Sequence, residues 1–230
     1  MNSWPAGKQN SSLQKLTIFI VLFGIVFGGC GTVDLKVRKN LDHPNIHPNT
    51  VAILPFTLAG PTPEGVPIHR LFRECFFNYF SYLGYVDIPL ETIDNKLHAA
   101  GMKNYKEVLG FSPEKLRDIL AVDAVIKGQV LETNNFTGGI HAETSIKAKI
   151  EMIDLRTGET LWETEHKERI YSGILSPNFV EIIQDQMDNA KVQQALYKTA
   201  EMFSIGIMMK IPDPATVWQK EIRLPKTVSY

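Results

Sequence analysis

The feature that most constrains the fold is a change in hydrophobic periodicity between Thr133 and Ile146. Before it, short continuous apolar runs alternate with stretches in which apolar residues recur at helical spacing. After it, apolar residues alternate with charged ones, as Ile146, Ala148 and Ile150 do with Lys147 and Lys149. The first pattern is typical of strands buried on both faces and of helices, and the second of strands with one dry face. One mixed sheet with helices packed on it is therefore expected.

The first half predicts three strands and three helices. Gly84 and Gly101 are expected to end the first two helices, and Ser112 followed by Pro113 is typical of the start of the third. The strands are expected at Val51–Phe56, Tyr85–Ile88 and Ala124–Thr133, and the helices at Leu71–Leu83, Leu90–Ala100 and Ser112–Ala121.

The second half predicts an antiparallel meander followed by a helix. Asn134–Gly139 and Asp154–Glu159 are interpreted as its two turns, and Ser176–Met209 as a long helical region. The fold class is α/β, a three-layer-like sandwich of a mixed sheet in the order β-α-β-α-α-β-β-β-α with helices packed on it. The domain is expected at 49–211, followed by a tail at 212–230.

The amino terminus has the pattern of a secretion signal, in which Lys8 and Lys15 precede the apolar run Leu16–Phe27. A helix of that length covers roughly 18 Å, too little for a hydrocarbon core of about 30 Å. Val26–Cys30 resembles the lipobox of bacterial lipoproteins, although Phe27 stands where that motif usually has Leu. A plain cleaved signal or an uncleaved anchor is the alternative interpretation.

The lipobox resemblance implies cleavage between Gly29 and Cys30 and a covalent lipid on the Cys30 sulfur; no other cofactor is expected. Residues 1–29 are then a signal peptide, and 30–48 carry the lipid and form a tether. Three acyl chains on one residue make release from a membrane negligible. Gly31 follows, and by the sorting rule of such lipoproteins the absence of Asp there favours the outer membrane. A protein that faces the periplasm is expected.

Composition argues for an ordinary globular domain. The formal net charge is -1 and 44% of residues are hydrophobic, which excludes neither binding nor catalysis but argues against disorder and nucleic-acid binding. Cys75, the second of two cysteines, lies among aromatic residues with helical spacing. It is interpreted as a buried small hydrophobe rather than a reactive thiol.

The sequence indicates neither an enzyme nor a metal site. It contains no G-x-S-x-G and no H-E-x-x-H motif. His43 and His47, each followed by Pro, are interpreted as solvated linker residues rather than metal ligands. His141 lies two residues before Glu143 and offers a single imidazole, and His166 is interpreted as part of a solvated strand face.

The segments VAILPF, LGYVDI, ILAVDAVIKGQV and IEMIDLRTGETLW follow one another within roughly Thr50–Met209. In this order they resemble a family of bacterial outer-membrane lipoproteins that includes a meningococcal surface vaccine candidate. More distantly they are similar to the superfamily of the curli secretion channel, the penicillin-binding-protein activator and an exopolysaccharide-export lipoprotein. The resemblance implies membrane-anchored proteins that form rings or hold other envelope machines and are not enzymes.

Two functions are compatible with this resemblance. The first is a structural or accessory subunit of an envelope transport or secretion assembly, which self-associates or binds a channel-like lipoprotein. The alternative is a regulatory module that activates a periplasmic or inner-membrane enzyme of the cell envelope, but the short Gly31–His47 segment favours the first. No small-molecule substrate is evident. The residues expected to touch a partner, in a Gly- and Pro-rich loop and in the first turn of the meander, are Thr57, Gly60, Glu64, Asn134 and Phe136.

Overall fold

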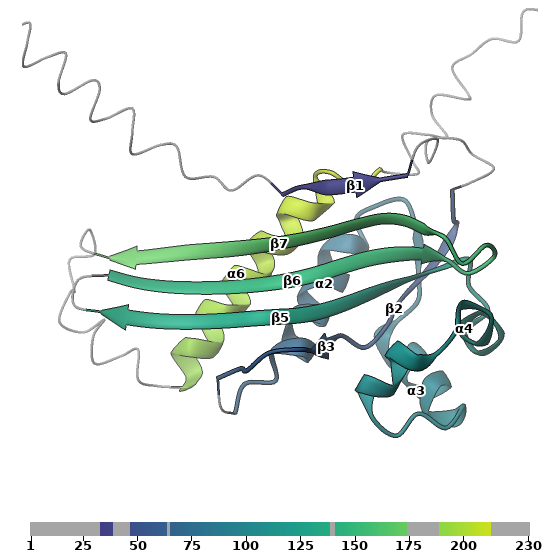
Figure 1. Ribbon diagram of the computed structural model, residues 1–230, viewed down its shortest axis with the longest axis horizontal. Coiled ribbons are helices and arrows are strands. Elements are labelled where there is room, and N and C mark those ends of the chain that lie inside the picture. The colour runs from purple at the N-terminus through teal and green to yellow at the C-terminus, as the bar shows by residue number, and fades with distance from the viewer. Residues whose placement is uncertain (1–32, 39–46, 64, 139–140, 174–188, 213–230) are drawn as a thin grey trace, which may run out of the picture. The chain divides into compact units, whose positions relative to one another are not determined.

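The computed structural model describes residues 33–38, 47–63, 65–138, 141–173 and 189–212 (Figure 1). Seven strands, four α-helices and one 3₁₀ helix are described there. The strands are β1 (Leu35–Val37), β2 (Thr50–Ile53), β3 (Thr57–Leu58), β4 (Val86–Asp87), β5 (Ala124–Gly138), β6 (His141–Asp154) and β7 (Thr160–Gly173). The helices are α2 (Ile68–Phe80), α3 (Leu90–Ala99), η1 (Tyr105–Gly110), α4 (Pro113–Leu120) and α6 (Asn189–Met208).

All described strands belong to one mixed sheet, in the order β1-β7-β6-β5-β2-β4, with β3 pairing with β5 beside β2. The pairs β5 with β6, β6 with β7 and β7 with β1 are antiparallel, whereas β2 runs parallel to both β4 and β5. Parallel neighbours need crossover connections, and here those contain helices. The expected mixed α/β sheet with helices packed on it is confirmed.

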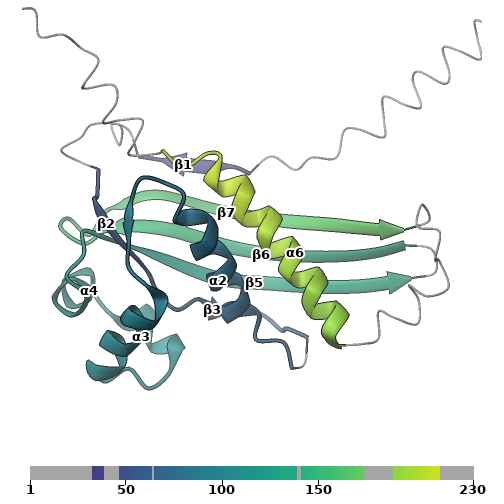
Figure 2. The ribbon, with the colours of Figure 1, turned by 180° about the vertical axis from the view of Figure 1, so that it is seen from behind.

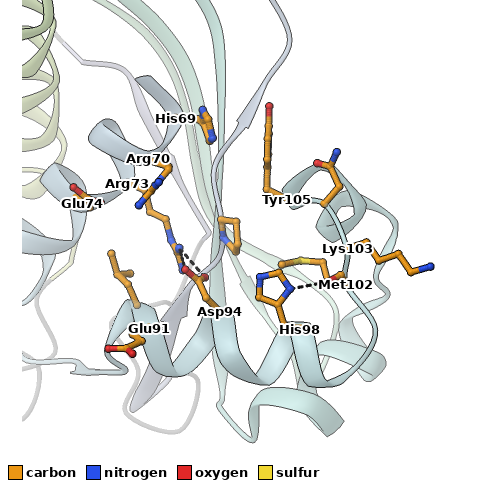
Figure 3. Close-up of a pocket in the computed structure, with 13 residues that line it drawn as sticks. His69, Arg70, Arg73, Glu74, Glu91, Asp94, His98, Met102, Lys103 and Tyr105 are labelled. Carbon is orange, nitrogen blue, oxygen red and sulfur yellow. Dashed lines mark hydrogen bonds and ion pairs between the residues drawn. The ribbon is translucent and has the colours of Figure 1, made fainter. Parts of the chain in front are cut away.

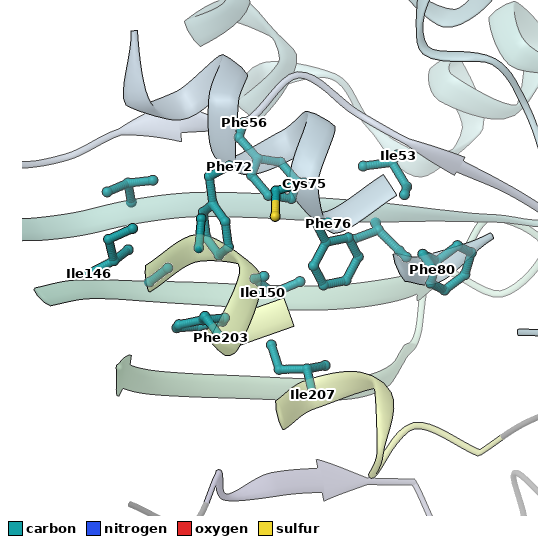
Figure 4. Close-up of a cluster of buried hydrophobic side chains, with 14 of the residues drawn as sticks. Ile53, Phe56, Phe72, Cys75, Phe76, Phe80, Ile146, Ile150, Phe203 and Ile207 are labelled. Carbon is teal, nitrogen blue, oxygen red and sulfur yellow. The ribbon is translucent and has the colours of Figure 1, made fainter. Parts of the chain in front are cut away.

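Helices α2 and α6 cover one face of the sheet, as Figure 2 shows from that side. Helix α6 turns Leu196, Ala200, Phe203 and Ile207 inward, at the spacing of one helix face. Aromatic rings of α2 meet them, with Phe72 edge-on to Phe203 at 5.0 Å between ring centroids (Figure 4). The alternating apolar residues of β6 form the floor of this main core.

A second, smaller core lies on the opposite face, where Ala52 of β2 and Val125 of β5 meet α3 and α4. Ser112 begins α4 as expected, because its Oγ accepts a hydrogen bond from the Lys115 amide at 3.2 Å. This second layer involves β2 and the first residues of β5. Further along β5, β6 and β7, no described helix of this layer covers the same face of the sheet. The polar side chains there alternate along each strand with the apolar side chains that face the main core.

Asp123 fixes the relative position of β2 and β5 at the end where the second core lies. Its Oδ2 accepts hydrogen bonds from the amides of Asn49 and Thr50 at 3.0 and 2.9 Å. Burial alone would raise the pKa of this carboxyl, but the hydrogen bonds outweigh burial and lower it. The ionised carboxylate therefore joins two strands that are far apart in sequence.

Several predicted boundaries are wrong. Leu35–Val37, expected within the tether, is a strand because the exposed edge of β7 supplies its pairing partners. Asn134–Gly139, expected as a turn, continues β5 to Gly138, since Asn134 pairs with Ser145 and Phe136 with Glu143 of β6. The first helix runs from Ile68 to Phe80 instead of from Leu71 to Leu83. In these cases pairing or packing between distant segments outweighs local composition.

Other predicted boundaries agree with the structure. Helix α3 ends at Ala99, and Gly101 adopts a φ of 96°, as expected for the residue that stops a helix. The turn predicted at Asp154–Glu159 separates β6 from β7. Of the predicted helical region Ser176–Met209, α6 accounts for Asn189–Met208, and residues 176–188 lie outside the described part of the chain.

Candidate functional site

Polar and charged side chains line the face of β5, β6 and β7 that points away from α2 and α6. We call this face the open face. Residues in register on three neighbouring strands lie side by side, so they form rows across it. From the second core outward the rows are Lys127–Glu151–Glu163, Gln129–Lys149–Glu165, Glu132–Lys147–Lys167, Asn134–Ser145–Arg169 and Phe136–Glu143–Tyr171.

Ion pairs link the middle rows of the open face. Lys147 Nζ lies 2.7 Å from Glu165 and Lys167 Nζ 2.7 Å from Glu132. Lys149 lies 3.4 Å from Glu163. A hydrogen bond from Lys147 is the main cause of the lowered pKa of Glu165. Charges of both signs are thus matched within the face, which gives it little net attraction for a highly charged partner.

The outermost rows differ from the middle ones. Phe136 and Tyr171 are 54% and 55% exposed although both are aromatic. Arg169 lies between them and the ion pairs, its guanidinium 4.0 Å from Glu143, and a hydrogen bond with Tyr171 raises its pKa. We call Asn134, Phe136, Glu143, Arg169 and Tyr171 the distal patch. Exposed aromatic residues beside an arginine are the composition typical of protein interfaces.

Two of the five residues predicted to touch a partner, Asn134 and Phe136, therefore lie together in the distal patch, on a strand instead of a turn. Arg169 and Tyr171 were not predicted, because only the pairing register of β7 places them beside Phe136. The sequence signal that could have found them is the two-residue alternation of β7, which puts both on one face.

Thr57, one of the residues predicted to touch a partner, is not exposed. It is buried in β3, and its hydroxyl donates a hydrogen bond to the Gly128 carbonyl at 3.5 Å. Gly60 is half-buried, and a Cβ there would meet the Leu131 carbonyl oxygen at 2.2 Å, so glycine serves close packing against β5. Glu64, Gly29 and Cys30, the last two predicted as the cleavage and lipidation residues, lie outside the described residues.

A cavity of about 680 Å³ opens between α2, α3 and the start of η1 (Figure 3). Arg73 crosses its inner wall. One guanidinium nitrogen donates to both carboxylate oxygens of Asp94 at 2.8 and 2.9 Å, and two others donate to the Ile53 carbonyl at 2.8 and 3.1 Å. Burial lowers the pKa of Arg73, and Asp94 opposes that effect. The ion pair holds β2, α2 and α3 together, which is a structural role.

The mouth of the same cavity carries the His69 ring, stacked on Tyr105 at 4.4 Å between centroids. Burial is the main cause of the lowered pKa of His69, with Arg70 adding to it, so this imidazole is neutral at pH 7. His98 donates from Nδ1 to the Met102 carbonyl at 2.8 Å. Sequence reasoning missed this cavity because its walls come from segments that are separate in the chain.

Cys75 is fully buried among the phenylalanines of the main core, as predicted. Burial is the main cause of its raised pKa, about 11, so the thiol is protonated and inert at neutral pH. Within the described residues no group of three or more His, Cys, Asp or Glu side chains is arranged to hold a metal ion. His43 and the side chain of His141 lie outside the part of the chain that the structure describes.

Two histidines are placed differently from the prediction. His47 is buried, with its ring stacked on Tyr85 at 5.1 Å between centroids, because the chain re-enters the sheet there. His166 points toward α6, where its ring lies 5.3 Å from that of Phe203 and its Nε2 3.2 Å from Glu168. The charged neighbours of His166 in sequence predicted a solvated face, whereas the strand register turns this residue toward the main core.

Comparison with known proteins assigns the chain to a family of lipoproteins. The model of the family described as "Putative lipoprotein GNA1162-like" matches residues 75–204, which is more than half of the chain. The chain belongs to this lipoprotein family. No helix among the described residues is both long enough and apolar enough to cross a membrane.

Individual relatives are more distant. "Putative lipoprotein NMB1124/NMB1162" of Neisseria meningitidis serogroup B (strain ATCC BAA-335 / MC58) is 29% identical over 82 residues, which are 36% of this chain and 38% of the relative. The crystal structure of lipoprotein GNA1162 from Neisseria meningitidis has a TM-score of 0.50 and 22% identity, covering 64% of this chain and 97% of that one. This likeness shows a shared fold. The PelC dodecamer from Paraburkholderia phytofirmans has a TM-score of 0.42 and 14% identity over 75% of this chain and 95% of that one, too distant to inform on this chain.

Proposed function

We propose that this lipoprotein is held in the outer membrane by a lipid on Cys30, faces the periplasm, and is a non-enzymatic structural or accessory subunit of an envelope transport or secretion assembly. The observation that carries the proposal is the distal patch, where two aromatic side chains of a lipoprotein domain are more than half exposed. Such residues supply most of the binding energy when an interface buries them. The partner is a second copy or a channel-like lipoprotein.

The distance between the anchor and the domain supports this function over the regulatory alternative. Only Gly31 and Thr32 separate Cys30 from Val33, and Val33 is already buried. Consecutive Cα atoms are 3.8 Å apart, so the chain between Cys30 and Val33 spans at most about 11 Å. A module that activates an enzyme across the periplasm needs a long tether, whereas a subunit of a membrane-bound assembly does not.

The anchor is tested by replacing Cys30 with Ala. Metabolic labelling with an alkyne fatty acid should mark the natural chain and not the Cys30→Ala variant, and membrane fractionation should move the variant out of the outer membrane. The matched control is Cys75→Ala, whose thiol is buried and should leave labelling unchanged. Continued labelling of the Cys30→Ala variant would contradict the proposed anchor.

The partner surface is tested by photo-crosslinking in the cell. A photoreactive amino acid at Phe136 should yield adducts with a second copy or another envelope lipoprotein, identified by mass spectrometry. The matched control is the same amino acid at Leu109, which is 49% exposed and lies in η1, in the layer of the second core. Equal adduct yields from Phe136 and Leu109 would contradict a role for the distal patch.

A further inference from the structure

The outer side of α6 carries an apolar surface that the proposed function leaves unexplained. Eight successive residues, Met202–Met209, contain no charge. Phe203 and Ile207 face the main core, while Met202 and Ile205 share another side of the helix. Met209, directly after α6, continues that side at the spacing i, i+3, i+7, since its amide donates to the Ile205 carbonyl. Met202 is 41% exposed and Met209 77% exposed. We call these three residues the α6 stripe.

The residues that follow the predicted anchor are fixed beside this stripe. The Val33 side chain packs against α6 so closely that a Cβ on Gly206 would lie 3.0 Å from Val33 Cγ2. The Val33 carbonyl also accepts a hydrogen bond from Lys210 Nζ, at the carboxyl end of α6. Two contacts to α6 thus hold the point at which the chain enters the domain, on the same turns of helix that carry Ile205 and Met209.

We infer that the α6 stripe lies against the lipid surface to which the chain is anchored. The inference rests on the proposed lipid at Cys30. The chain from Cys30 to Val33 reaches at most about 11 Å, so the bilayer surface must lie close to Gly206 and its neighbours. Transfer of methionine and isoleucine side chains from water to the boundary between headgroups and acyl chains lowers the free energy.

Charge at the end of α6 fits the same orientation. Lys210 follows the stripe directly and is exposed, whereas Lys36 of β1 points to the open face, where it pairs with Glu163. Lysine beside an apolar helix side is typical of surfaces that meet phosphate-bearing lipids, because the ammonium group reaches the phosphates while the apolar residues insert. The open face of the sheet lies on the other side from α6 and stays available to a protein partner.

The orientation is tested by fluorescence quenching on the full, lipidated chain in vesicles of phosphatidylethanolamine and phosphatidylglycerol. A thiol-reactive fluorophore is attached to the introduced cysteine of a Met209→Cys variant and, in a matched control, to that of a Leu109→Cys variant. Leu109 is apolar and half-exposed, and it belongs to the layer on the opposite face of the sheet from α6. Cys75 is buried, and the unsubstituted chain reports any labelling of it. A nitroxide carried on the lipid acyl chain serves as quencher, and iodide reports access from water.

The lipid-borne nitroxide should quench the fluorophore at Met209 at least about threefold more strongly than that at Leu109, while iodide shows the reverse order. Equal quenching by the nitroxide at the two positions would overturn the inference. So would a fluorophore at Met209 shielded from both quenchers, since that result indicates a covering protein or second copy. Mass spectrometry of Cys30 separates the two proposals: an unmodified Cys30 overturns the anchor and this inference together, whereas equal quenching with lipidated Cys30 overturns the inference alone.

Discussion

On the side covered by α2 and α6, β6 presents Ile146, Ala148 and Ile150, all fully buried; on the other side the residues between them are Lys147 and Lys149, which pair with carboxylates. The backbone is the same for both faces, so the difference comes from side chains alone. The covered face provides the apolar burial that stabilises the fold. The open face contributes little to stability, and its side chains are free to be selected for binding.

The largest difference between the faces is expected in thiol chemistry. In a Phe136→Cys variant, iodoacetamide at pH 8 should alkylate the introduced thiol more than about a hundredfold faster than Cys75, because a thiol with a pKa near 11 is almost entirely protonated and Cys75 is buried. Peptide mass spectrometry reads the two positions separately in one sample. Rates within tenfold of each other would show that the covered face opens readily.

The same pair of faces can be compared with one substitution in each. Phe203→Ala removes a ring that contacts Phe72 and His166 and should lower the free energy of unfolding by about 3–5 kcal/mol. Phe136→Ala on the open face should change it by less than about 0.5 kcal/mol. Urea unfolding followed by tryptophan fluorescence, to which buried Trp162 contributes, measures both. Equal losses would contradict the division into a stabilising and a binding face.

Close packing on the covered face is tested at Gly128 of β5. A Cβ there would lie 2.5 Å from the Phe56 ring, which is itself buried, so Gly128→Ala should cost about 1–3 kcal/mol. Gly110→Ala is the control, because a Cβ at Gly110 meets nothing within 4 Å. Urea midpoints of the two variants should separate clearly. An unaffected Gly128→Ala variant would show that Phe56 can move aside.

The smallest effect is expected for the ion pairs of the open face. Lys147→Ala removes the partner of Glu165 and should lower stability less than Phe203→Ala or Gly128→Ala, since exposed ion pairs contribute little. The pKa of Glu165 is lowered in the folded protein, so the contribution is present above the ordinary carboxyl pKa and is lost as pH falls through the folded pKa. The difference between Lys147→Ala and the natural chain should shrink as the pH falls below the ordinary carboxyl pKa and in 1 M NaCl. A difference that persists in both conditions would contradict a surface ion pair.

Local signals in the sequence predicted the elements that depend on local chemistry. Ser112 before Pro113 marked the start of α4, and Gly101 marked the end of α3. The alternation from Ile146 to Met152 predicted which side of β6 is dry. These features follow from capping, backbone conformation and period-two patterning, which a single sequence displays directly.

Features that depend on distant partners were missed. Strand β1 has three residues and no recognisable pattern, and it forms because the edge of β7 is available. The polar stretch after Thr133 has the composition of a turn, yet it stays extended because β6 continues beside it. For the candidate site, Asn134 and Phe136 were found from the sequence, whereas Arg169 and Tyr171 needed the register of β7.

Strand β1 also bears on the order in which the chain folds. Strands β5, β6 and β7 pair with their neighbours in sequence, whereas Lys36 and Glu163, which face each other across β1 and β7, are 127 residues apart. Closing so long a loop costs entropy that local hairpins do not pay, so the meander should form early and β1 should join it last. The segment that follows the proposed anchor would then be the last piece of the sheet to pair, after the open face has already formed.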